Sequence, residues 1–381
     1  MIESLSQSQQ RILEALNKNG ELTYEELVEL TGMSYSGVTS RITELIRMGF
    51  NIQRMRDGLN TVLRYDGDYE SEDKGGRKQI SALDRVKSAN DFYEIKDILD
   101  DLKDKKPSYK LKKAKKFKGK KCGMLVLSDL HFGQIVLNEE GEEIYNTEKA
   151  VESLRTLASS VIDKMIDNDL SNIYIGMIGD MVDGDNIYRN HMFYVEKPAI
   201  EQIKDVTKAL TEFINTLETA GFNIHIGCVR GNHGITNYKN LEVDNWDNVV
   251  YDMLSLVFKD NKNVHIDHFS SDTAKVNVLD KQVVLSHGQE MGPQIKTASG
   301  LKTFRGICNK YRLNDGDFMV VGHLHEFGVE GDQNRYLIRN GALPYASEYA
   351  MKLNFFGEPM QTFLIINEGQ HYPMICPIQV N

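Results

Sequence analysis

Five short apolar runs in this chain are each followed at once by a polar motif. The runs span residues 124–127, 173–178, 224–229, 283–285 and 318–321. Runs of this length predict buried β-strands, because strands that are covered on both faces read as nearly continuous apolar sequence. Loops that leave one edge of such a sheet bring side chains from distant parts of the sequence together. The pattern therefore predicts an α/β fold with a polar site at a sheet edge.

The five motifs supply carboxylate, amide and imidazole groups in a fixed order. They are Asp129-Leu130-His131, Gly179-Asp180-Met181-Val182-Asp183, Gly231-Asn232-His233, Ser286-His287-Gly288 and Gly322-His323-Leu324-His325. Five of the ten histidines lie in these motifs, so the histidines are concentrated where the predicted loops converge. Any one of these histidines alone is as readily an ordinary loop or core residue. The complete series indicates a metal site.

This series resembles the calcineurin-like metallophosphoesterases, whose motifs are D-x-H, G-D-x-x-D, G-N-H-[DE], a lone H and G-H-x-H. The resemblance runs from Cys122 to the C-terminus and implies a two-sheet β sandwich flanked by helices. It also implies the ligands of two metal ions, of which Asp180 would bridge both. The first ion would be held by Asp129, His131, Asp180 and His325. The second ion would be held by Asp180, Asn232, His287 and His323.

Two cations roughly 3.5–4 Å apart suit phosphodiester hydrolysis, because they activate a bridging hydroxide and neutralise charge on the phosphoryl oxygens. Mixed nitrogen and oxygen ligands favour Mn²⁺, Fe, Zn²⁺ or Ni²⁺ over Mg²⁺ and Ca²⁺, which prefer shells made of oxygen alone. We expect Mn²⁺ to support activity.

His233 follows the expected ligand Asn232 but is needed by neither ion. We expect it to act as the general acid that protonates the leaving oxygen, because imidazole titrates near neutral pH. The chain departs from the family pattern here, since Gly234 stands where an acidic residue is usual. Asp183 or Glu242 could supply the missing carboxylate and a catalytic role. Asp183 could equally orient a ligand histidine.

The residues after the second motif bear on the substrate. Protein phosphatases of this superfamily carry arginine directly after G-D-x-V-D, and this chain has Gly184. The loop 186–194 instead mixes aromatic residues with Arg189 and His191. We expect these two side chains to contact substrate, since aromatic faces stack on bases and arginine neutralises phosphate. The alternative is an ordinary loop that buries its aromatic residues.

The first 66 residues predict a separate winged helix-turn-helix, which resembles the biotin-repressor type. Helices are expected over residues 7–19, 23–31 and 34–48, from their apolar stripes and from a capping box of Thr23 and Glu26. Alternating runs on either side of Asp57-Gly58 predict the hairpin that forms the wing.

Arginines gather in the predicted third helix and wing of this module. Those expected to contact DNA are Arg41, Arg54 and Arg56. A basic face on these elements is what docking on a duplex requires. The alternative is a module for protein contacts, with solvated arginines. The net charge of −10 argues against a general coat of nucleic acid, so contacts with phosphates would be local.

Residues 67–121 are expected to link this module to a catalytic domain over residues 122–381. The link combines a polar stretch, an apolar segment suited to a helical hairpin or a homo-oligomer contact, and a lysine-rich run. The lysines would either grip a phosphate backbone or form a solvated tether. No signal pattern or membrane span is evident, and the four cysteines lack paired spacing, so we expect a cytoplasmic location.

Together these features predict an enzyme, a two-metal phosphodiesterase. The simplest form is an exonuclease or endonuclease acting on DNA in repair, recombination or phage metabolism. The DNA-repair exonucleases of the SbcD kind are the nearest analogy for the catalytic domain. One alternative is a phosphodiesterase for cyclic nucleotides or another small phosphoester, with the winged helix as an assembly module. A regulator with a decayed metal site is the non-enzymatic alternative, and the complete ligand set argues against it.

Overall fold

The computed structural model describes eleven stretches of the chain. They are residues 5–47, 50–57, 60–68, 120–138, 141–185, 187, 191–236, 244–289, 291, 298–345 and 358–380. The chain divides into two compact units, Met1–Val86 and Lys87–Asn381, and each is described by itself. The expected linker over residues 67–121 lies almost wholly outside the described residues, so its helical and lysine-rich parts stay predictions.

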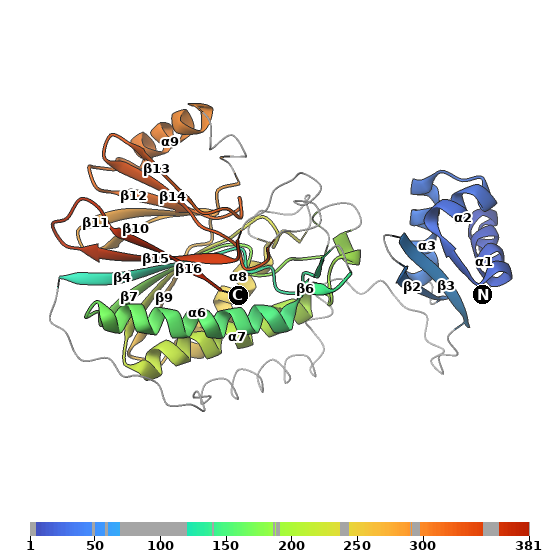
Figure 1. Ribbon diagram of the computed structural model, residues 1–381, viewed down its shortest axis with the longest axis horizontal. Helices are drawn as coiled ribbons and strands as arrows, with labels where there is room; N and C mark the ends of the chain where they lie inside the picture. Colours follow the sequence, from blue (N-terminus) through green and yellow to red (C-terminus); the bar gives the residue numbers. More distant parts are fainter. Residues whose placement is uncertain are drawn as a thin grey trace. The chain divides into compact units, whose positions relative to one another are not determined.

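The first unit is a winged helix-turn-helix (Figure 1). Its helices are α1 (Gln7–Asn19), α2 (Tyr24–Thr31) and α3 (Tyr35–Arg47). Its strands are β1 (Glu21–Thr23), β2 (Phe50–Asp57) and β3 (Asn60–Asp68), in the order β1-β3-β2. The helices share a buried core in which Ile12, Leu27 and Ile42 are fully covered. The predicted three helices and hairpin are confirmed, whereas the biotin-repressor type stays a prediction.

Hydrogen-bonded caps fix where the first two helices begin. Thr23 Oγ1 accepts from the backbone N–H of Glu26 at 3.2 Å, and the Glu26 carboxylate accepts from the N–H of Thr23 at 2.7 Å. This reciprocal pair satisfies donors that a helix start leaves unpaired, which confirms the predicted capping box. Ser6 and Gln9 form a second such box at α1.

The second unit contains two large β-sheets. The six-stranded sheet has the order β16-β15-β4-β7-β8-β9. Its strands are β4 (Lys121–Leu127), β7 (Asn172–Ile178), β8 (Asn223–Val229), β9 (Val264–His268), β15 (Met360–Asn367) and β16 (Met374–Gln379). The five-stranded sheet has the order β10-β11-β12-β14-β13. Its strands are β10 (Thr273–Val278), β11 (Lys281–Ser286), β12 (Phe318–Val321), β13 (Gly328–Asp332) and β14 (Arg335–Arg339).

Helices cover the outer face of each sheet, which gives four layers (Figure 1). They are α6 (Thr147–Asp167), α7 (Ala199–Ala220) and α8 (Trp246–Phe258) on the six-stranded sheet and α9 (Ala298–Tyr311) on the other. Fully buried residues such as Val126, Leu285 and Val320 fill the space between the sheets. A small hairpin, β5 (Val136–Leu137) and β6 (Glu143–Tyr145), and a short helix, η2 (His191–Phe193), lie in the connections. The predicted two-sheet α/β sandwich flanked by helices is confirmed.

The strand directions explain how five distant motifs reach one place. Strands β4, β7 and β8 run parallel to one another, and so do β11 and β12. Each of the five apolar runs lies within one of these strands, and its motif follows the carboxyl end. Loops after parallel strands leave the same edge of a sheet. The predicted relation between strands and motifs is therefore confirmed.

The cysteines and the helices bear on two further features of the chain. Cys122, Cys228, Cys308 and Cys376 are all unpaired thiols, and the first three are buried. Unpaired, buried cysteines behave as small apolar core residues. Among the described residues, no helix combines the length and the apolar character that a membrane span requires.

Candidate metal centre

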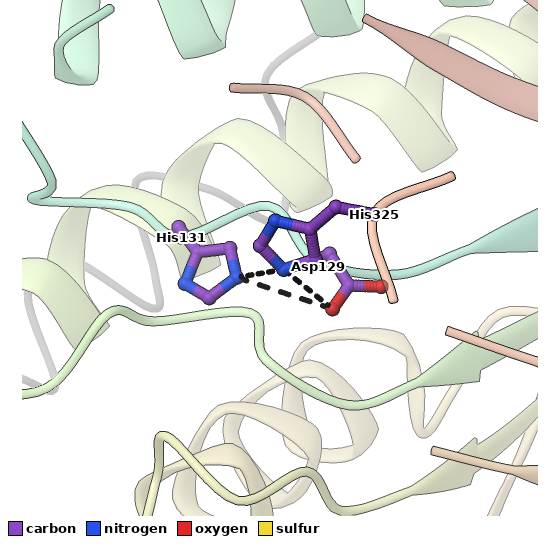
Figure 2. Close-up of side chains that lie close together, drawn as sticks. All are labelled: Asp129, His131 and His325. Carbon is purple, nitrogen blue, oxygen red and sulfur yellow. Dashed lines mark hydrogen bonds and ion pairs between the residues drawn. The ribbon is translucent and has the colours of Figure 1, made fainter. Parts of the chain in front are cut away.

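Asp129, His131 and His325 form the first of two ligand groups (Figure 2). The first two residues follow β4, and His325 follows β12. His131 Nε2 lies 3.0 Å from His325 Nε2, and His325 Nε2 lies 3.3 Å from Asp129 Oδ1. Asp129 and His131 are fully buried. Donor atoms from three motif positions thus meet in one small volume.

The second group contains Asp180, His287 and His323, whose ligand atoms lie within 4.8 Å of one another. His287 Nε2 is 3.0 Å from Asp180 Oδ2 and also 3.0 Å from Asn232 Oδ1. These four residues come from the loops after β7, β8, β11 and β12. The structure therefore brings together all the residues that were expected to hold metal.

Asp180 lies between the two groups. Its Oδ2 atom, which faces His287, is also 4.0 Å from His131 Nε2 in the first group. Its Oδ1 atom accepts a hydrogen bond from the backbone N–H of His233 at 2.8 Å. One oxygen is thus held by the backbone, and the other faces both ligand groups, as a shared ligand must.

Hydrogen bonds determine which nitrogen of two histidines is left for an ion. His131 Nδ1–H donates to Asp183 Oδ1 at 2.8 Å, and His287 Nδ1–H donates to the carbonyl of Ile178 at 2.9 Å. In a neutral imidazole the Nε2 atom then carries a lone pair. Lone pairs and carboxylate oxygens that converge at such short distances are best satisfied by a cation. The donor set therefore fits a pair of divalent metal ions.

The carboxylates at the centre are held in their ionised form. Burial alone would raise the pKa values of Asp180 and Asp183, but the neighbouring histidines outweigh it and keep both pKa values well below the usual range. Burial alone would lower the pKa of His287, but Asp180 outweighs burial and raises it to about 10. Burial lowers the pKa of His323 to about 4. Asp180 and Asp183 are therefore ionised at neutral pH.

The backbone at these ligands is strained. Ten non-glycine residues in the described part of the chain have positive φ angles, and half of them belong to this site. They are Asp129, His131, Asp180, His323 and His325, with φ between 45° and 66°. Each such conformation costs about 1–3 kcal/mol and persists only where surrounding packing enforces it. The loops are therefore shaped to aim these side chains rather than to relax.

His233 lies beside the ligand groups with one ring nitrogen fixed. Its Nδ1–H donates to the backbone carbonyl of Asp183 at 2.9 Å, and the Asp183 carboxylate lies 3.2 Å from the same nitrogen. The side chain is 18% exposed, whereas that of Asp183 is fully buried. Burial alone would lower the pKa of His233, but Asp180 and Asp183 raise it to about 9. Asp183 thus orients His233, and the residue after His233 is a glycine.

Asp183 also orients His131, one of the expected metal ligands. Its Oδ1 atom accepts from His131 and, at 3.2 Å, from Gln134 Nε2, while its Oδ2 atom accepts from His191 Nε2–H at 2.6 Å. A fully buried carboxylate with this many donors cannot reach a substrate directly. Of the two roles that the sequence left open for Asp183, the geometry matches the orienting one.

His191 was expected at the substrate, but the structure directs it at Asp183. The ring is buried, its Nε2–H donates to Asp183, and its Nδ1 accepts the backbone N–H of Ile187 at 3.2 Å. Both ring nitrogens form hydrogen bonds within the protein, so His191 helps to fix the position of Asp183. Arg189, the other expected substrate contact, and Glu242 lie outside the described residues.

Asp247 is a site residue that the sequence analysis missed. Its fully buried carboxylate accepts backbone N–H groups of Asp180 and Met181 at 3.0 Å and of Gly231 at 2.8 Å. Burial, together with Asp180, raises the pKa of Asp247 to about 6. One carboxylate therefore ties the loop that carries Asp180 to the loop that carries Asn232. In the sequence it looks like any acidic residue in a first helical turn, which conceals this role.

The start of α8 also explains Gly234. Asn245, the N-cap residue of α8, accepts the N–H of Asp247 at 2.9 Å and donates to the carbonyl of Gly231 at 2.8 Å. A Cβ atom at position 234 would overlap Asn245 Oδ1. The glycine thus makes room for the cap that places Asp247.

Two of three comparisons with known proteins found similar proteins. A family model described as winged helix-turn-helix DNA-binding matches residues 5–50. The search of curated proteins found no match. The matching solved structures include a predicted phosphoesterase of Streptococcus pneumoniae, with 10% identity, a TM-score of 0.31 and coverage of 68% of this chain and 90% of that chain.

Two further solved structures are similar over the same share of the chain. YfcE, a phosphoesterase from E. coli, has 14% identity and a TM-score of 0.30, with coverage of 68% of this chain and 100% of that chain. Vacuolar protein sorting 29 of Cryptosporidium parvum has 13% identity and a TM-score of 0.33, with coverage of 68% and 98%. Sequence identities and TM-scores this low assign no function to the site.

Asp247 provides a test of how the ligand loops are held. Asp247→Asn replaces one acceptor oxygen with an N–H₂ donor, so at least one of the three backbone donors loses its partner. We expect the affinity for divalent metal to fall by about 10–100-fold, as for other residues that orient ligands. Metal titration by calorimetry measures this, and circular dichroism checks that the fold is retained. Asp252→Asn, on the same helix but exposed, is the matched control, and equal metal affinities in both variants would contradict the role.

Proposed function

We propose that residues 122–381 form a phosphodiesterase that uses two divalent metal ions, and that its substrate is DNA. The observation that carries this proposal is the position of Asp180, whose Oδ2 atom faces His287 at 3.0 Å and His131 at 4.0 Å. A carboxylate shared by two ligand groups is suited to ions roughly 3.5–4 Å apart. Such ions, when bound, neutralise charge on the phosphoryl oxygens and supply Lewis acidity.

The chain's own residues would position and protonate the reacting groups. Asp183 holds the rings of His131 and His233 through Nδ1, so the Nε2 atom of each is directed away from it. His233 Nε2 has no hydrogen bond to a described residue, and its side chain is partly exposed. We assign His233 the role of the acid that delivers a proton to the leaving oxygen.

Mn²⁺ is the metal that we propose for activity. Imidazole nitrogens of His131, His287, His323 and His325 accompany the oxygens of Asp129, Asp180 and Asn232 in the ligand set. Mixed sets of this kind suit Mn²⁺, Fe, Zn²⁺ or Ni²⁺, and carboxylate and amide oxygens suit Mn²⁺ among these.

DNA is proposed as the substrate because of the N-terminal unit. A winged helix-turn-helix DNA-binding model matches residues 5–50, and such modules place a recognition helix in the major groove. Arg41 lies on α3, and Arg54 and Arg56 lie on β2 of the hairpin. The chain has a net charge of −10, so any positive charge that attracts a duplex must be local. These arginines would provide that charge.

Asp180→Asn tests the shared ligand. The amide cannot carry the negative charge that two ions share, so we expect loss of hydrolysis of bis(p-nitrophenyl) phosphate beyond the roughly 10–100-fold typical of orienting residues. Chelation of the unmodified protein should abolish activity, and Mn²⁺ should restore it best. Asp167→Asn, exposed at the end of α6, is the control variant. Full activity in excess chelator would refute the assignment.

His233→Ala tests the proton donor. An acid matters most for a poor leaving group such as a sugar alkoxide, so the variant should lose about 10²–10⁴-fold on DNA but far less on an activated nitrophenyl ester. Metal content should be retained. His268→Ala, whose ring is hydrogen-bonded to Asp252 and Asn248, serves as the control. Equal losses on both substrates would assign His233 a structural role instead.

The arginines test whether DNA is the substrate. Replacing Arg41, Arg54 and Arg56 with alanine should weaken duplex binding and flatten the slope of log affinity against log salt by up to about three, one for each lost phosphate contact. Turnover of the nitrophenyl ester should not change. Arg11→Ala/Lys18→Ala, which removes charge from α1, is the control. Absent DNA affinity at moderate salt, together with rapid hydrolysis of cyclic nucleotides, would favour the small-phosphoester alternative.

A further inference from the structure

A second cluster of potential ligands lies on strands β8 and β9, away from the candidate metal centre. His225 Nε2 is 2.7 Å from Asp267 Oδ2, and His265 Nε2 is 3.0 Å from Asp267 Oδ1. The three ligand atoms all lie within 4.8 Å of one another. Each residue offers a group that binds transition metals, and none belongs to the five motifs.

The sheet itself produces this arrangement. His225 and His265 are register partners on the parallel strands β8 and β9, and Asp267 is the partner of Gly227. Residues two apart on a strand point to the same face, so His265 and Asp267 stand on the face that also carries His225. Ligands on adjacent strands are held by the backbone hydrogen bonds of the sheet and need little reorganisation to bind an ion.

The cluster is separate from the candidate metal centre. His225 is seven residues before Asn232 along an extended strand, which at roughly 3.3 Å per residue places it about 20 Å away. It stands near the amino end of β8, whereas the five motifs follow carboxyl ends. Its side chains are 47%, 67% and 40% exposed for His225, His265 and Asp267, so an ion can reach them from solvent.

Both imidazoles can present a lone pair. Their hydrogen bonds with described residues run through Nε2 to Asp267 alone, and neither Nδ1 atom has a hydrogen bond within the described part of the chain. The exposed Nδ1 atoms can therefore carry the hydrogen in water, which frees both Nε2 atoms as ligands. Two imidazole nitrogens and one carboxylate oxygen suit Zn²⁺, Ni²⁺ or Cu²⁺ and exclude Mg²⁺ and Ca²⁺ as preferred ions.

A buried hydroxyl beside the cluster adds an independent observation. Tyr174 is the register partner of His225, and their rings lie 5.1 Å apart. Its hydroxyl is buried and has no hydrogen-bond partner among the described residues. It lies over Gly227, where a Cβ atom would overlap it, and Gly227 is the neighbour of Asp267 on β8. A buried donor without a partner is uncommon, and a water carried by a nearby ion would give it one.

We propose that His225, His265 and Asp267 bind a third metal ion of the Zn²⁺ class, which ties β9 to β8. Strand β9 is the last strand of the six-stranded sheet among the described elements, so one of its edges lacks a strand partner there. Three protein ligands fix the ion and leave at least one coordination position open to water or to a donor from another molecule. The site does not depend on the proposed phosphodiesterase.

Zn²⁺ stoichiometry tests the proposal. The full-length protein, equilibrated with buffered Zn²⁺ and analysed by atomic emission, should bind one equivalent more than His225→Ala/His265→Ala. Asp267→Asn should show the same deficit, because it removes the charged ligand without removing a ring. Hydrolysis of bis(p-nitrophenyl) phosphate should be unchanged in both, since the site lies at the other end of the strands. His371→Ala, which removes an exposed histidine elsewhere, should keep every equivalent.

The Asp180→Asn background separates this proposal from the proposed function. If the third site exists, one Zn²⁺ equivalent remains in that variant and disappears when His225→Ala/His265→Ala is added. Its binding should also raise the melting temperature of the Asp180→Asn variant, whereas Mg²⁺ should not. Equal Zn²⁺ content with and without the two histidines, in either background, would overturn the proposal, and circular dichroism excludes misfolding as the cause of a deficit.

Discussion

The rest of this site depends on the contacts that the Asp180 carboxylate makes. One of its oxygens is fixed by the N–H of His233, and the other faces the imidazoles of His131 and His287. Two sheets must meet for this to happen, since His131 follows a strand of one sheet and His287 a strand of the other. The sandwich core, with Leu285 buried between the sheets, holds these strand ends in place. The packing of the core therefore fixes the geometry of the site.

The loops of the site are also held in place, because their backbones approach each other closely. A Cβ atom at Gly231 would overlap the Asp180 carboxylate, so only glycine lets the two loops come this close. Asp247 then joins them through three backbone donors, while Asp183 aligns His131 and His233. The positive φ angles at five of the expected metal ligands are the cost of this arrangement. Buried hydrogen bonds and core packing offset it.

Local signals in the sequence predicted much of the fold. The apolar runs became the central strands, and the capping box of Thr23 and Glu26 begins α2 as predicted. Strand direction brings the motifs to one edge of each sheet, and the packing of the two sheets brings the two sets of motifs together. What the sequence could not provide were contacts between residues far apart in the chain. Asp247 looks like an ordinary first-turn residue, and only the packing of α8 against two loops makes it an anchor.

For His191, the local sequence predicted a role that its contacts in the folded protein do not match. Its loop composition favoured a role at the substrate, because exposed aromatic and basic residues are common there. In the folded protein its ring is buried and bonded to Asp183, which the local sequence does not reveal. The amino end of β8 is a further example, since His225 and His265 are 40 positions apart and become neighbours only through the sheet register.

Anomalous diffraction from crystals soaked in Mn²⁺ tests the central claim most directly, because it locates each ion independently of activity. The account predicts two peaks roughly 3.5–4 Å apart, with the Asp180 carboxylate between them. One peak should adjoin His131 and His325, and the other should adjoin His287 and His323. A single peak, or ions bound away from Asp180, would contradict the shared-carboxylate account.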